Sequence, residues 1–515
     1  MLTDITGAKC VGIDAVKVTV ETDITSGIGI HLVGLADVAV KESLLRTTTA
    51  LGSLSFHIPG RKIVINLAPA DLRKSGSGYD LPIAVGIIAA SGQMEFDGAD
   101  RYVIMGELGL NAEVRYIPGG LPIAEMARAE GFRGAILPYD SALEAAEIRG
   151  LPVYGVKSLP EVLRILSGRE DCEDLLIWNR CAERGQGPDT PDRDIPDFTD
   201  ILGQEQAKRG MEIAAAGGHN IMMLGAPGSG KSSLAKALPG ILPPMTPEEA
   251  LTTSKIYSVA GKANPGFGLL RRRPFRSPHC SASIPAIIGG GGAEGVYPGE
   301  ITLAQGGVLF LDEFGQMPKS VIEALRGPME DRKVVISRLK CKVEYPASFM
   351  LVAASNPCPC GYFGEGERCR CTPVQRANYL SRLSGPIMDR IDIQVWLKTV
   401  DTAVIMQNRK GESSAEVARR VLAARERQKK RFGEGDIFVN AEMSARDLDT
   451  FCPLDNSCME MMERLINGMG LSVRAYHRII RVARTIADLE GAEAIRPEHL
   501  CEAAGYRFLD KVKGL

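Results

Sequence analysis

The sequence predicts a multidomain α/β protein whose C-terminal region is helical. The chain has 515 residues, which is too long for one hydrophobic core and suits about three domains. Short apolar runs that favour buried strands, such as Ile221 to Leu224 and Gly307 to Leu311, alternate with segments of helical spacing. From residue 398 to residue 515 the pattern is helical. We therefore expect two α/β regions followed by a helical one.

Composition excludes several classes of protein. The formal net charge is −2, so any contact with nucleic acid must use local basic patches. The best apolar run, Leu81 to Ala90, is too short to span a membrane. The start MLTDITGAKC lacks the pattern of a secretory signal. Four of the 12 cysteines share one short window, so we expect a cytoplasmic protein with one metal or redox site.

Residues 1–168 are predicted to form an α/β domain, and residues 169–196 a linker. The predicted strands and helices of the domain are Val16 to Val20, Ile63 to Leu67, Ala36 to Leu51 and Pro122 to Glu130. The linker includes GQGPDTPDRDIPD, which is rich in Pro, Asp and Gly and has little apolar periodicity. Such a segment cannot bury a face, so we expect it to provide only reach.

The segment GAPGSGKS, from Gly225 to Ser232, fits the phosphate-binding pattern G-x-x-x-x-G-K-[ST]. It follows a predicted strand and precedes a predicted helix, which is the context that this loop requires. Its glycines let backbone N–H groups turn toward phosphate oxygens, Lys231 is expected to reach the β- and γ-phosphates, and Ser232 to hold Mg²⁺. The predicted nucleotide-binding residues are Gly225, Ala226, Pro227, Gly228, Ser229, Gly230, Lys231, Ser232, Ser233 and Asp312. ATP with Mg²⁺ is the expected ligand.

Two carboxylates follow a second predicted strand. The run Gly307 to Leu311 ends at Asp312 and Glu313, and a buried strand delivers its C-terminal side chains to the edge where ligands lie in open α/β sheets. Asp312 is predicted to complete the Mg²⁺ shell, and Glu313 to polarise the attacking water. These motifs place a nucleotide-binding domain at residues 197–397.

A cysteine window lies near the end of this domain. Cys358, Cys360, Cys369 and Cys371 form two C-x-C pairs, enough for a tetrahedral Zn²⁺ site in a loop with little core of its own. C-x-C is a less usual spacing than C-x-x-C, so redox use or free thiols remain alternatives. Catalytic zinc is not expected, because four protein ligands leave no open position.

A basic hairpin is predicted over Val335 to Val343, which reads VISRLKCKV. Arg338, Lys340 and Lys342 recur with period two, so they are predicted to share one face that suits a phosphate backbone. The alternative is a solvated hairpin edge whose cations prevent aggregation. The segment ARRVLAARERQKKRF, residues 418–432, has basic positions at helical spacing and fits a DNA-facing surface or a solvated lid helix equally.

Several stretches resemble the ComM/YifB family of magnesium-chelatase-like AAA+ ATPases. They include VGLADVAVKES, INLAPADLRKSGSGYDLPIAVGIIAAS, GELGLNAEVRYIPGGLPIA and residues 273–313. Within that last stretch Cys280 and Gln305 stand where family members commonly have histidine, so the roles of these two positions do not carry over. The resemblance implies a Lon-protease-like N-terminal domain, an AAA+ core and a helical C-terminal lid over residues 398–515.

The resemblance also implies roles for single residues. Asn356 looks like the sensor that orients water near the γ-phosphate, and Arg474, in LSVRAYHR, like the second sensor. In SRLSGPIMDRI, Arg390 is the first candidate for an arginine finger that completes a neighbouring subunit's site, and Arg382 the second. The implied function is a ring-forming, hexameric ATP-driven motor that moves branched or single-stranded DNA, as in branch migration during natural transformation.

Two other functions are weighed against this one. A magnesium chelatase motor subunit would use the same core to insert Mg²⁺ into a porphyrin, but such subunits do not resemble residues 1–168. A Lon-like peptidase or unfoldase needs a serine at the position of Gly78, whereas Ser77 is one residue early. It also needs a lysine after Gly119-Gly120-Leu121, where Pro122 follows instead. The N-terminal domain is therefore predicted to be a non-proteolytic scaffold or a collar that contacts nucleic acid.

Overall fold

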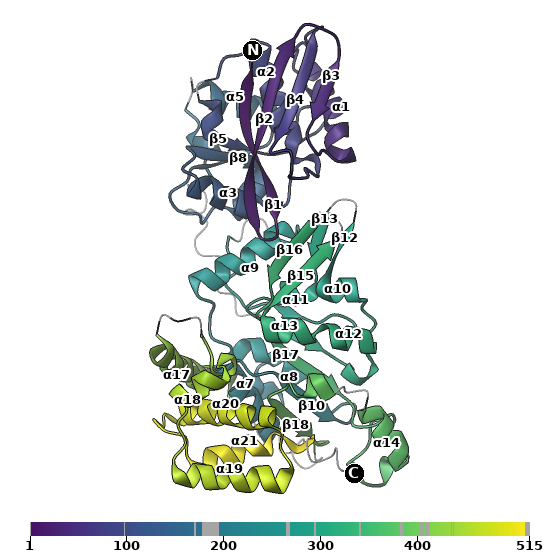
Figure 1. Cartoon of the computed structure of the whole chain (residues 1–515), viewed down its shortest axis with the longest axis vertical. Helices are drawn as coiled ribbons and strands as arrows, with labels where there is room; N and C mark the ends of the chain where they lie inside the picture. The colour runs from purple at the N-terminus through teal and green to yellow at the C-terminus, as the bar shows by residue number, and fades with distance from the viewer. Residues whose placement is uncertain are drawn as a thin grey trace.

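The chain folds into three units that follow one another along the sequence. The structure, a computed structural model, describes residues 2–96, 98–168, 171–177, 195–263, 268–292, 295–338, 341–381, 385–400, 406, 411–433, 435 and 437–509. In Figure 1 the N-terminal unit lies at one end in purple and blue, the central unit in teal and green in the middle, and the C-terminal helices in yellow at the other end. Among the described residues, no helix is both long and apolar enough to cross a bilayer.

The N-terminal unit is built on a mixed seven-stranded sheet in the order β3-β4-β2-β1-β5-β8-β9. The β1–β2 and β2–β4 pairs are antiparallel, and the other pairs are parallel. The strands are β1 (Thr3–Val11), β2 (Asp14–Thr25), β3 (Ile30–Val33), β4 (Lys62–Ala68), β5 (Tyr102–Ile104), β8 (Gly134–Pro138) and β9 (Val153–Val156), with the short pair β6 (Glu107–Leu108) and β7 (Val114–Arg115) apart from the sheet.

Five α-helices complete this unit among the residues that the structure describes. They are α1 (Val38–Ser53), α2 (Asp80–Ala90), α3 (Gly120–Ala129), α4 (Tyr139–Glu144) and α5 (Leu159–Ser167). Asp37 caps α1 by accepting a hydrogen bond from the Val40 N–H at 2.9 Å. Leu175 and Ile177 are buried in the same core, and the Ile177 N–H donates to the Val153 carbonyl at 3.0 Å. The unit therefore extends past residue 168, into the segment that the sequence analysis gives to the linker; most of that segment lies outside the described residues.

The central unit contains a five-stranded parallel sheet in the order β11-β14-β17-β10-β18. The strands are β10 (Ile221–Gly225), β11 (Phe275–Arg276), β14 (Val308–Leu311), β17 (Met350–Ser355) and β18 (Ile393–Leu397). Because the strands are parallel, their carboxyl ends meet at one edge. The phosphate-binding loop, Asp312 and Asn356 follow three neighbouring strands at that edge.

Helices and two hairpins surround this sheet. The helices are α7 (Glu205–Gly217), α8 (Lys231–Ala237), α9 (Pro247–Val259), α10 (Ile284–Ile288), α11 (Glu300–Leu303), α12 (Lys319–Ala324), α13 (Arg326–Asp331), α14 (Pro373–Leu380) and α15 (Gly385–Met388). The hairpins pair β12 (Gly289–Gly292) with β13 (Gly295–Pro298), and β15 (Lys333–Arg338) with β16 (Cys341–Pro346).

The C-terminal unit is helical, as predicted. It comprises α17 (Ser414–Phe432), α18 (Ala445–Phe451), α19 (Asn456–Met469), α20 (Val473–Glu490) and α21 (Pro497–Gly505). A capping box formed by Ser413 and Glu416 starts α17. Residues of α17, α20 and α21 share one hydrophobic core with α7 and β10, so this unit is packed firmly against the central sheet.

Helix α9 joins the central unit to the N-terminal unit. The Lys255 ammonium lies 2.5 Å from Asp14 and 2.6 Å from Glu125. One turn further, the Ser258 hydroxyl donates to the buried carboxyl of Glu144. Burial raises the pKa of that carboxyl to about 7. The two units are thus held together by polar contacts as well as by apolar packing.

Candidate nucleotide-binding site

The phosphate-binding loop lies between β10 and α8, where the sequence places it. Gly228 and Gly230 have φ angles of 78° and 93°, a region that residues with a Cβ rarely adopt. A Cβ on Gly225 would lie 2.6 Å from the Leu397 carbonyl oxygen. The loop therefore requires its glycines for shape. Ala226, Pro227 and Ser229 lie between these glycines, and Ser233 is exposed in the first turn of α8.

The Lys231 side chain is held inside this loop. Only 8% of its surface is exposed, and its Nζ donates to the carbonyls of Gly225 at 2.7 Å and Ala226 at 2.9 Å. It also lies 3.3 Å from the Asn356 amide oxygen, which follows β17. Burial lowers the pKa of the ammonium, and the Asp312 carboxylate opposes that shift. The predicted phosphate-binding lysine and the predicted sensor asparagine are therefore direct neighbours.

The two predicted Mg²⁺ ligands are also brought together. The Ser232 hydroxyl donates to Asp312 Oδ2 at 2.9 Å, although the two residues are 80 positions apart in the sequence. A hydroxyl and a carboxylate are the oxygen ligands that this type of site supplies to Mg²⁺. Ser229 Oγ, in the same loop, is buried and lacks a hydrogen-bond partner among the described residues, as expected of a polar atom beside a phosphate site. The residues present fit a nucleotide with Mg²⁺.

Glu313 follows Asp312 in a left-handed conformation, with φ 50°. Its side chain is exposed, and its backbone N–H donates to Asp312 Oδ1 at 2.8 Å. Its Oε2 accepts a hydrogen bond from the Cys280 thiol at 3.6 Å. Burial, followed by this hydrogen bond, raises the pKa of the Cys280 thiol. The predicted catalytic base is therefore in contact with a cysteine for which the sequence gives no role.

Arg390 lies in a different environment from an exposed arginine finger. Its side chain is 8% exposed, forms an ion pair with Glu330 of the same chain at 2.5 Å, and donates to the Pro386 carbonyl at 2.7 Å. Its buried Nε has no hydrogen-bond partner among the described residues. Within one chain the guanidinium is thus occupied, and action on a neighbour would require the pair with Glu330 to open. The alternative finger, Arg382, lies outside the described residues.

Helix α20 carries the predicted second sensor in its first turn. The Arg474 side chain is 67% exposed and lies 3.9 Å from Asp389. One turn further along, Arg478 forms an ion pair with the buried carboxylate of Asp392, directly before β18. Burial alone would raise the pKa of Asp392, but Arg478 and His219 bring it well below its usual value. Asp392 therefore fastens the arginine-bearing helix to the central sheet.

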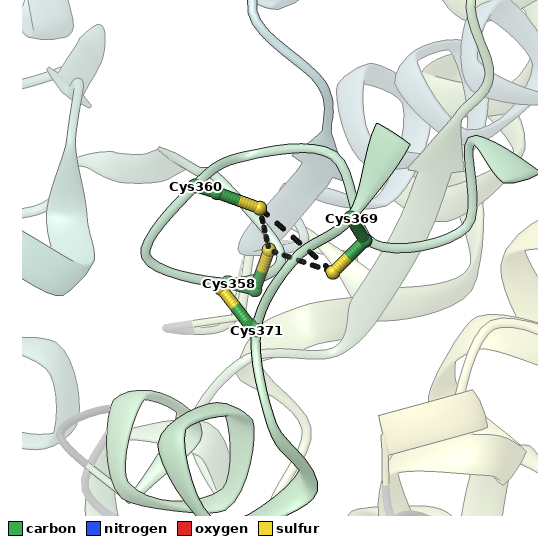
Figure 2. Close-up of side chains that lie close together, drawn as sticks. All are labelled: Cys358, Cys360, Cys369 and Cys371. Atoms are coloured by element: carbon green, nitrogen blue, oxygen red, sulfur yellow. Dashed lines mark hydrogen bonds between the residues drawn. The ribbon is translucent and has the colours of Figure 1, made fainter. Parts of the chain in front are cut away.

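The four cysteines of the predicted metal site converge in one loop, as Figure 2 shows. All four Sγ atoms lie within 4.8 Å of one another. The distances from Cys358 to Cys360 and from Cys360 to Cys369 are 3.4 and 3.8 Å. Zinc–sulfur bonds of about 2.3 Å in a tetrahedron imply sulfur separations of about 3.8 Å, so this set, completed by Cys371, could hold a metal ion. Backbone N–H groups of Tyr362 and Arg370 lower the pKa of Cys360 to about 6, whereas burial raises the pKa of Cys358 to about 12.

The predicted basic hairpin is present as β15 and β16. Its register pairs Ser337 with Lys342 and Arg338 with Cys341. Directly paired residues lie on the same face of a hairpin, so the positions of Arg338 and Lys342 are on opposite faces. The turn between the strands interrupts the period of two, and the prediction that all three cations share one face is therefore wrong. Lys342 is exposed, and Lys340 lies outside the described residues.

Comparisons with known proteins agree with this geometry. Family models match in three parts: magnesium chelatase subunit ChlI over residues 197–405, subunit ChlI of Mg-chelatase over residues 20–141, and the ChlI C-terminal region over residues 411–507. The uncharacterized protein YifB of Salmonella typhimurium is 41% identical over 503 residues, covering 97% of this chain and 96% of that protein. The chain belongs to the ComM/YifB family of magnesium-chelatase-like proteins.

Two further relatives of this ComM/YifB-family chain are informative. The competence protein ComM of Haemophilus influenzae is 41% identical over 502 residues, 97% of this chain and 96% of that protein. The magnesium-chelatase 38 kDa subunit of Cereibacter sphaeroides is 23% identical over 329 residues, 60% of this chain and 89% of that protein. Membership of the family supports a protein of the AAA+ ATPase type, with ATP and Mg²⁺ as its ligands.

The turn that resembles the nucleophile turn of Lon proteases has partners of its own in this family member. The Ser77 hydroxyl donates to Glu107, and the Ser75 hydroxyl accepts from Lys9 on β1. Pro122 is buried in α3, at the position where a Lon-type site needs its lysine. The sequence analysis predicts that this turn lacks the serine and the lysine of a Lon-type site, and it does not predict the contact between Ser75 and Lys9.

Three functional neighbours were missed by sequence reasoning: Glu330 beside Arg390, Asp392 beside Arg478, and the thiol of Cys280 beside Glu313. A signal was available for Arg478, although none indicated its partner Asp392. Arg474 and Arg478 are one helical turn apart, which indicates two cations on one face of a lid helix. For the other two contacts the partners are 60 and 33 residues apart, and no local pattern joins them.

Proposed function

We propose that this chain is an ATP-driven motor that assembles into a hexameric ring and moves DNA, acting in branch migration during recombination. The proposal that the chain hydrolyses ATP is supported by one observation. Four residues converge at one edge of the central sheet: Lys231, Ser232, Asp312 and Asn356. When bound, Mg²⁺ neutralises phosphate charge. The chain's own residues cradle the phosphates through loop N–H groups, neutralise them with Lys231 and orient the water through Glu313 and Asn356.

The ring is proposed because the site is incomplete in one chain. Phosphoryl transfer is accelerated strongly by an arginine near the transferred group. Arg390 is engaged with Glu330 of its own chain, and Arg474 is exposed at the start of α20. A neighbouring chain that displaces Glu330 would release Arg390 toward the adjoining phosphate site, so assembly and hydrolysis would be coupled.

DNA is proposed as the substrate on two grounds. Lys342 projects from the exposed side of the β15–β16 hairpin, and a ring of such hairpins would present repeated cations to a phosphate backbone. The relative from Haemophilus influenzae is named a competence protein, which fits a role in handling DNA taken up by cells. Structural Zn²⁺ on Cys358, Cys360, Cys369 and Cys371 is part of the same proposal, since those thiols match its coordination.

The DNA half is tested by ATPase assays with single-stranded, duplex and four-way-junction DNA. We expect turnover to rise with branched or single-stranded DNA and the rise to weaken in Lys342→Ala. Lys333→Ala is the matched control, because Lys333 lies on the same hairpin but forms an ion pair with Glu344 at 3.2 Å. Loss of a phosphate contact should reduce the salt slope of DNA binding by about one per chain. If DNA stimulates ATP turnover equally in the parent, Lys342→Ala and Lys333→Ala, the hairpin does not contact DNA.

A chelatase role is the second candidate, favoured by the match to the 38 kDa magnesium-chelatase subunit. Turnover that rises with a porphyrin and a partner subunit, and stays unchanged with DNA, would favour that role over ours. A peptidase role is tested with casein. Digestion that is lost in Ser77→Ala or Ser75→Ala would overturn our proposal of a non-proteolytic N-terminal domain.

A further inference from the structure

The turn between β1 and β2 belongs to the N-terminal unit but contacts a hairpin of the central unit. A Cβ on Gly12 would lie 3.1 Å from the Glu344 carbonyl oxygen and 3.4 Å from Val343 Cγ1 of β16. The next residue, Ile13, is partly buried against the apolar cluster that contains Val343 and Ile336. Figure 1 shows the end of β1 that leads into this turn beside β16 and α9. Two segments more than 300 residues apart thus meet at the β15–β16 hairpin.

The same turn is also anchored to α9. The Asp14 carboxylate lies 2.5 Å from the Lys255 ammonium, which lies 2.6 Å from Glu125 of α3 as well. One turn further along α9, the Ser258 carbonyl accepts a hydrogen bond from the Gly119 N–H at 3.0 Å. Because α9 is held by two elements of the N-terminal unit, the turn keeps its position beside β16 as long as these contacts persist.

The β15–β16 hairpin depends on packing from outside its own two strands. It forms a separate two-stranded sheet, and an isolated hairpin of this kind is at best marginally stable in water. Near its base, the Tyr345 hydroxyl donates to the Val296 carbonyl of β13 at 3.2 Å. Nearer its turn, Val343 is 5% exposed and lies beside Gly12. The N-terminal unit therefore supports the half of the hairpin that is closer to the turn.

The cation of the hairpin lies on the face that this support leaves open. Consecutive residues of a strand point to opposite faces, so the side chain of Lys342 is opposite that of the buried Val343. Lys342 is exposed. A strand that is already held from behind loses less freedom when its exposed side chain binds an anion, and a smaller loss means tighter binding.

We propose that the β1–β2 turn, with Ile13 as its apolar contact, is a brace that positions Lys342 for contact with the phosphate backbone of DNA. The inference rests on the proposed role of the β15–β16 hairpin in DNA binding. It gives the N-terminal unit a task in the motor that requires no peptidase chemistry, and it makes Ile13 a positioning residue for the DNA contact.

The test measures ATP turnover by the full-length protein as a single-stranded thymidine oligonucleotide is added. In Ile13→Ala we expect half-maximal activation to require about three- to tenfold more DNA, because the hairpin must then be ordered on binding. Turnover without DNA and KM for ATP should stay unchanged. Ile13→Val keeps a branched apolar side chain and should restore the parent behaviour. Val16→Ala is the matched control, since Val16 lies on β2 close to the turn and is 45% exposed.

Asp14→Asn loosens the same turn without changing its apolar contact. Its effect on activation by DNA should have the same direction as that of Ile13→Ala and be smaller, because Glu125 still holds Lys255. This variant also keeps the inference testable if Ile13→Ala folds poorly.

A double variant separates positioning from an independent contact. Ile13→Ala combined with Lys342→Ala should lose no more affinity for DNA than Lys342→Ala alone. The salt slope of DNA binding in Ile13→Ala should shift toward that of Lys342→Ala, since the same phosphate contact is weakened. Losses that multiply, or an equal fall in turnover without DNA, would overturn the inference.

Lys342→Ala distinguishes the two levels of failure. If this variant binds DNA like the parent, the proposed contact of the hairpin with DNA is wrong. If it weakens binding while Ile13→Ala and Asp14→Asn behave like the parent, this inference alone fails.

Discussion

The phosphate side and the arginine side of the site differ in how complete they are within one chain. On the phosphate side, Lys231 meets Asn356 and Ser232 meets Asp312, all through direct contacts. On the arginine side, Arg390 is buried against Glu330 of its own chain. The first side is ready to receive a ligand, whereas the second must change its partner before it can contact one.

The difference follows from how each side is built. Loop and strand-end residues are positioned by the parallel sheet itself, because consecutive carboxyl ends face the same edge. An arginine that serves a neighbour has no such support, and a buried guanidinium must be paired wherever it lies. The single chain therefore satisfies Arg390 internally, and assembly must replace that pairing.

The largest effect is expected on the phosphate side, from Lys231→Ala. Removal of the ammonium leaves the phosphates without their main neutralising group, so nucleotide binding should weaken and turnover should be lost. Glu313→Gln should bind ATP normally and lose turnover by about a hundredfold or more. Both are measured by ATP binding and steady-state hydrolysis. Lys236→Ala, at an exposed lysine of the same helix, is the control. Parent turnover in either active-site variant would contradict this assignment.

The arginine side is tested by complementation. Arg390→Ala chains should bind ATP but hydrolyse it about a hundredfold or more slowly, because the transition state lacks its cation. Mixing them with Lys231→Ala chains, which have an intact Arg390 and a defective phosphate site, should restore part of the turnover if the arginine acts between chains. If mixing restores nothing, Arg390 acts only within its own chain, and the arginine side of the site does not depend on a neighbouring chain. The same mixture with Arg382→Ala tests the alternative finger.

The convergence of the residues on the phosphate side could be predicted from the sequence because the motifs are local. Residues 225–232 specify loop, glycine conformations and ligand types within eight positions, and the run before Asp312 identifies a buried strand end. The sequence predicted the hairpin but not its register, since a turn of unknown length shifts the alternation between Arg338 and Lys342. It could not predict that Arg390 would find Glu330, because 60 residues separate them and many exposed glutamates were equally available.

A smaller effect is expected where α20 is attached to the sheet. Asp392→Asn should lower the free energy of unfolding by about 3 kcal/mol, because Arg478 and its neighbours then face a buried site without a charge partner. Asp389→Asn is the control, since the exposed pair with Arg474 should contribute less than about 1 kcal/mol. Both values come from denaturant unfolding. Equal losses in the two variants would show that the buried carboxylate is not the attachment point.

The pH dependence of the same variant has a defined sign. The pKa of Asp392 is depressed in the folded chain, so its contribution to stability is present at neutral pH. That contribution should decline as the pH falls below about 4, the usual pKa of an aspartate. The difference in unfolding free energy between parent and Asp392→Asn should therefore be present at neutral pH, at about 3 kcal/mol, and narrow in acid. A difference that widens in acid would contradict the depressed pKa.

The smallest effect is expected from the cysteine loop, and it should fall on the phosphate side alone. A Cβ on Gly361 would lie 2.9 Å from Pro227, so the loop that holds the thiols packs directly on the phosphate-binding loop. Removal of zinc by a chelator, or Cys369→Ser, should loosen that packing and raise KM for ATP about two- to fivefold while kcat changes less, since a contact of this kind contributes under about 1 kcal/mol.

Metal analysis should find one zinc per chain in the parent, and Cys501→Ser should retain it. If the metal is lost without any change in KM, the thiols support only their own loop. If removal of the metal instead abolishes the complementation between Arg390→Ala and Lys231→Ala chains, the cysteine loop acts on the arginine side of the site.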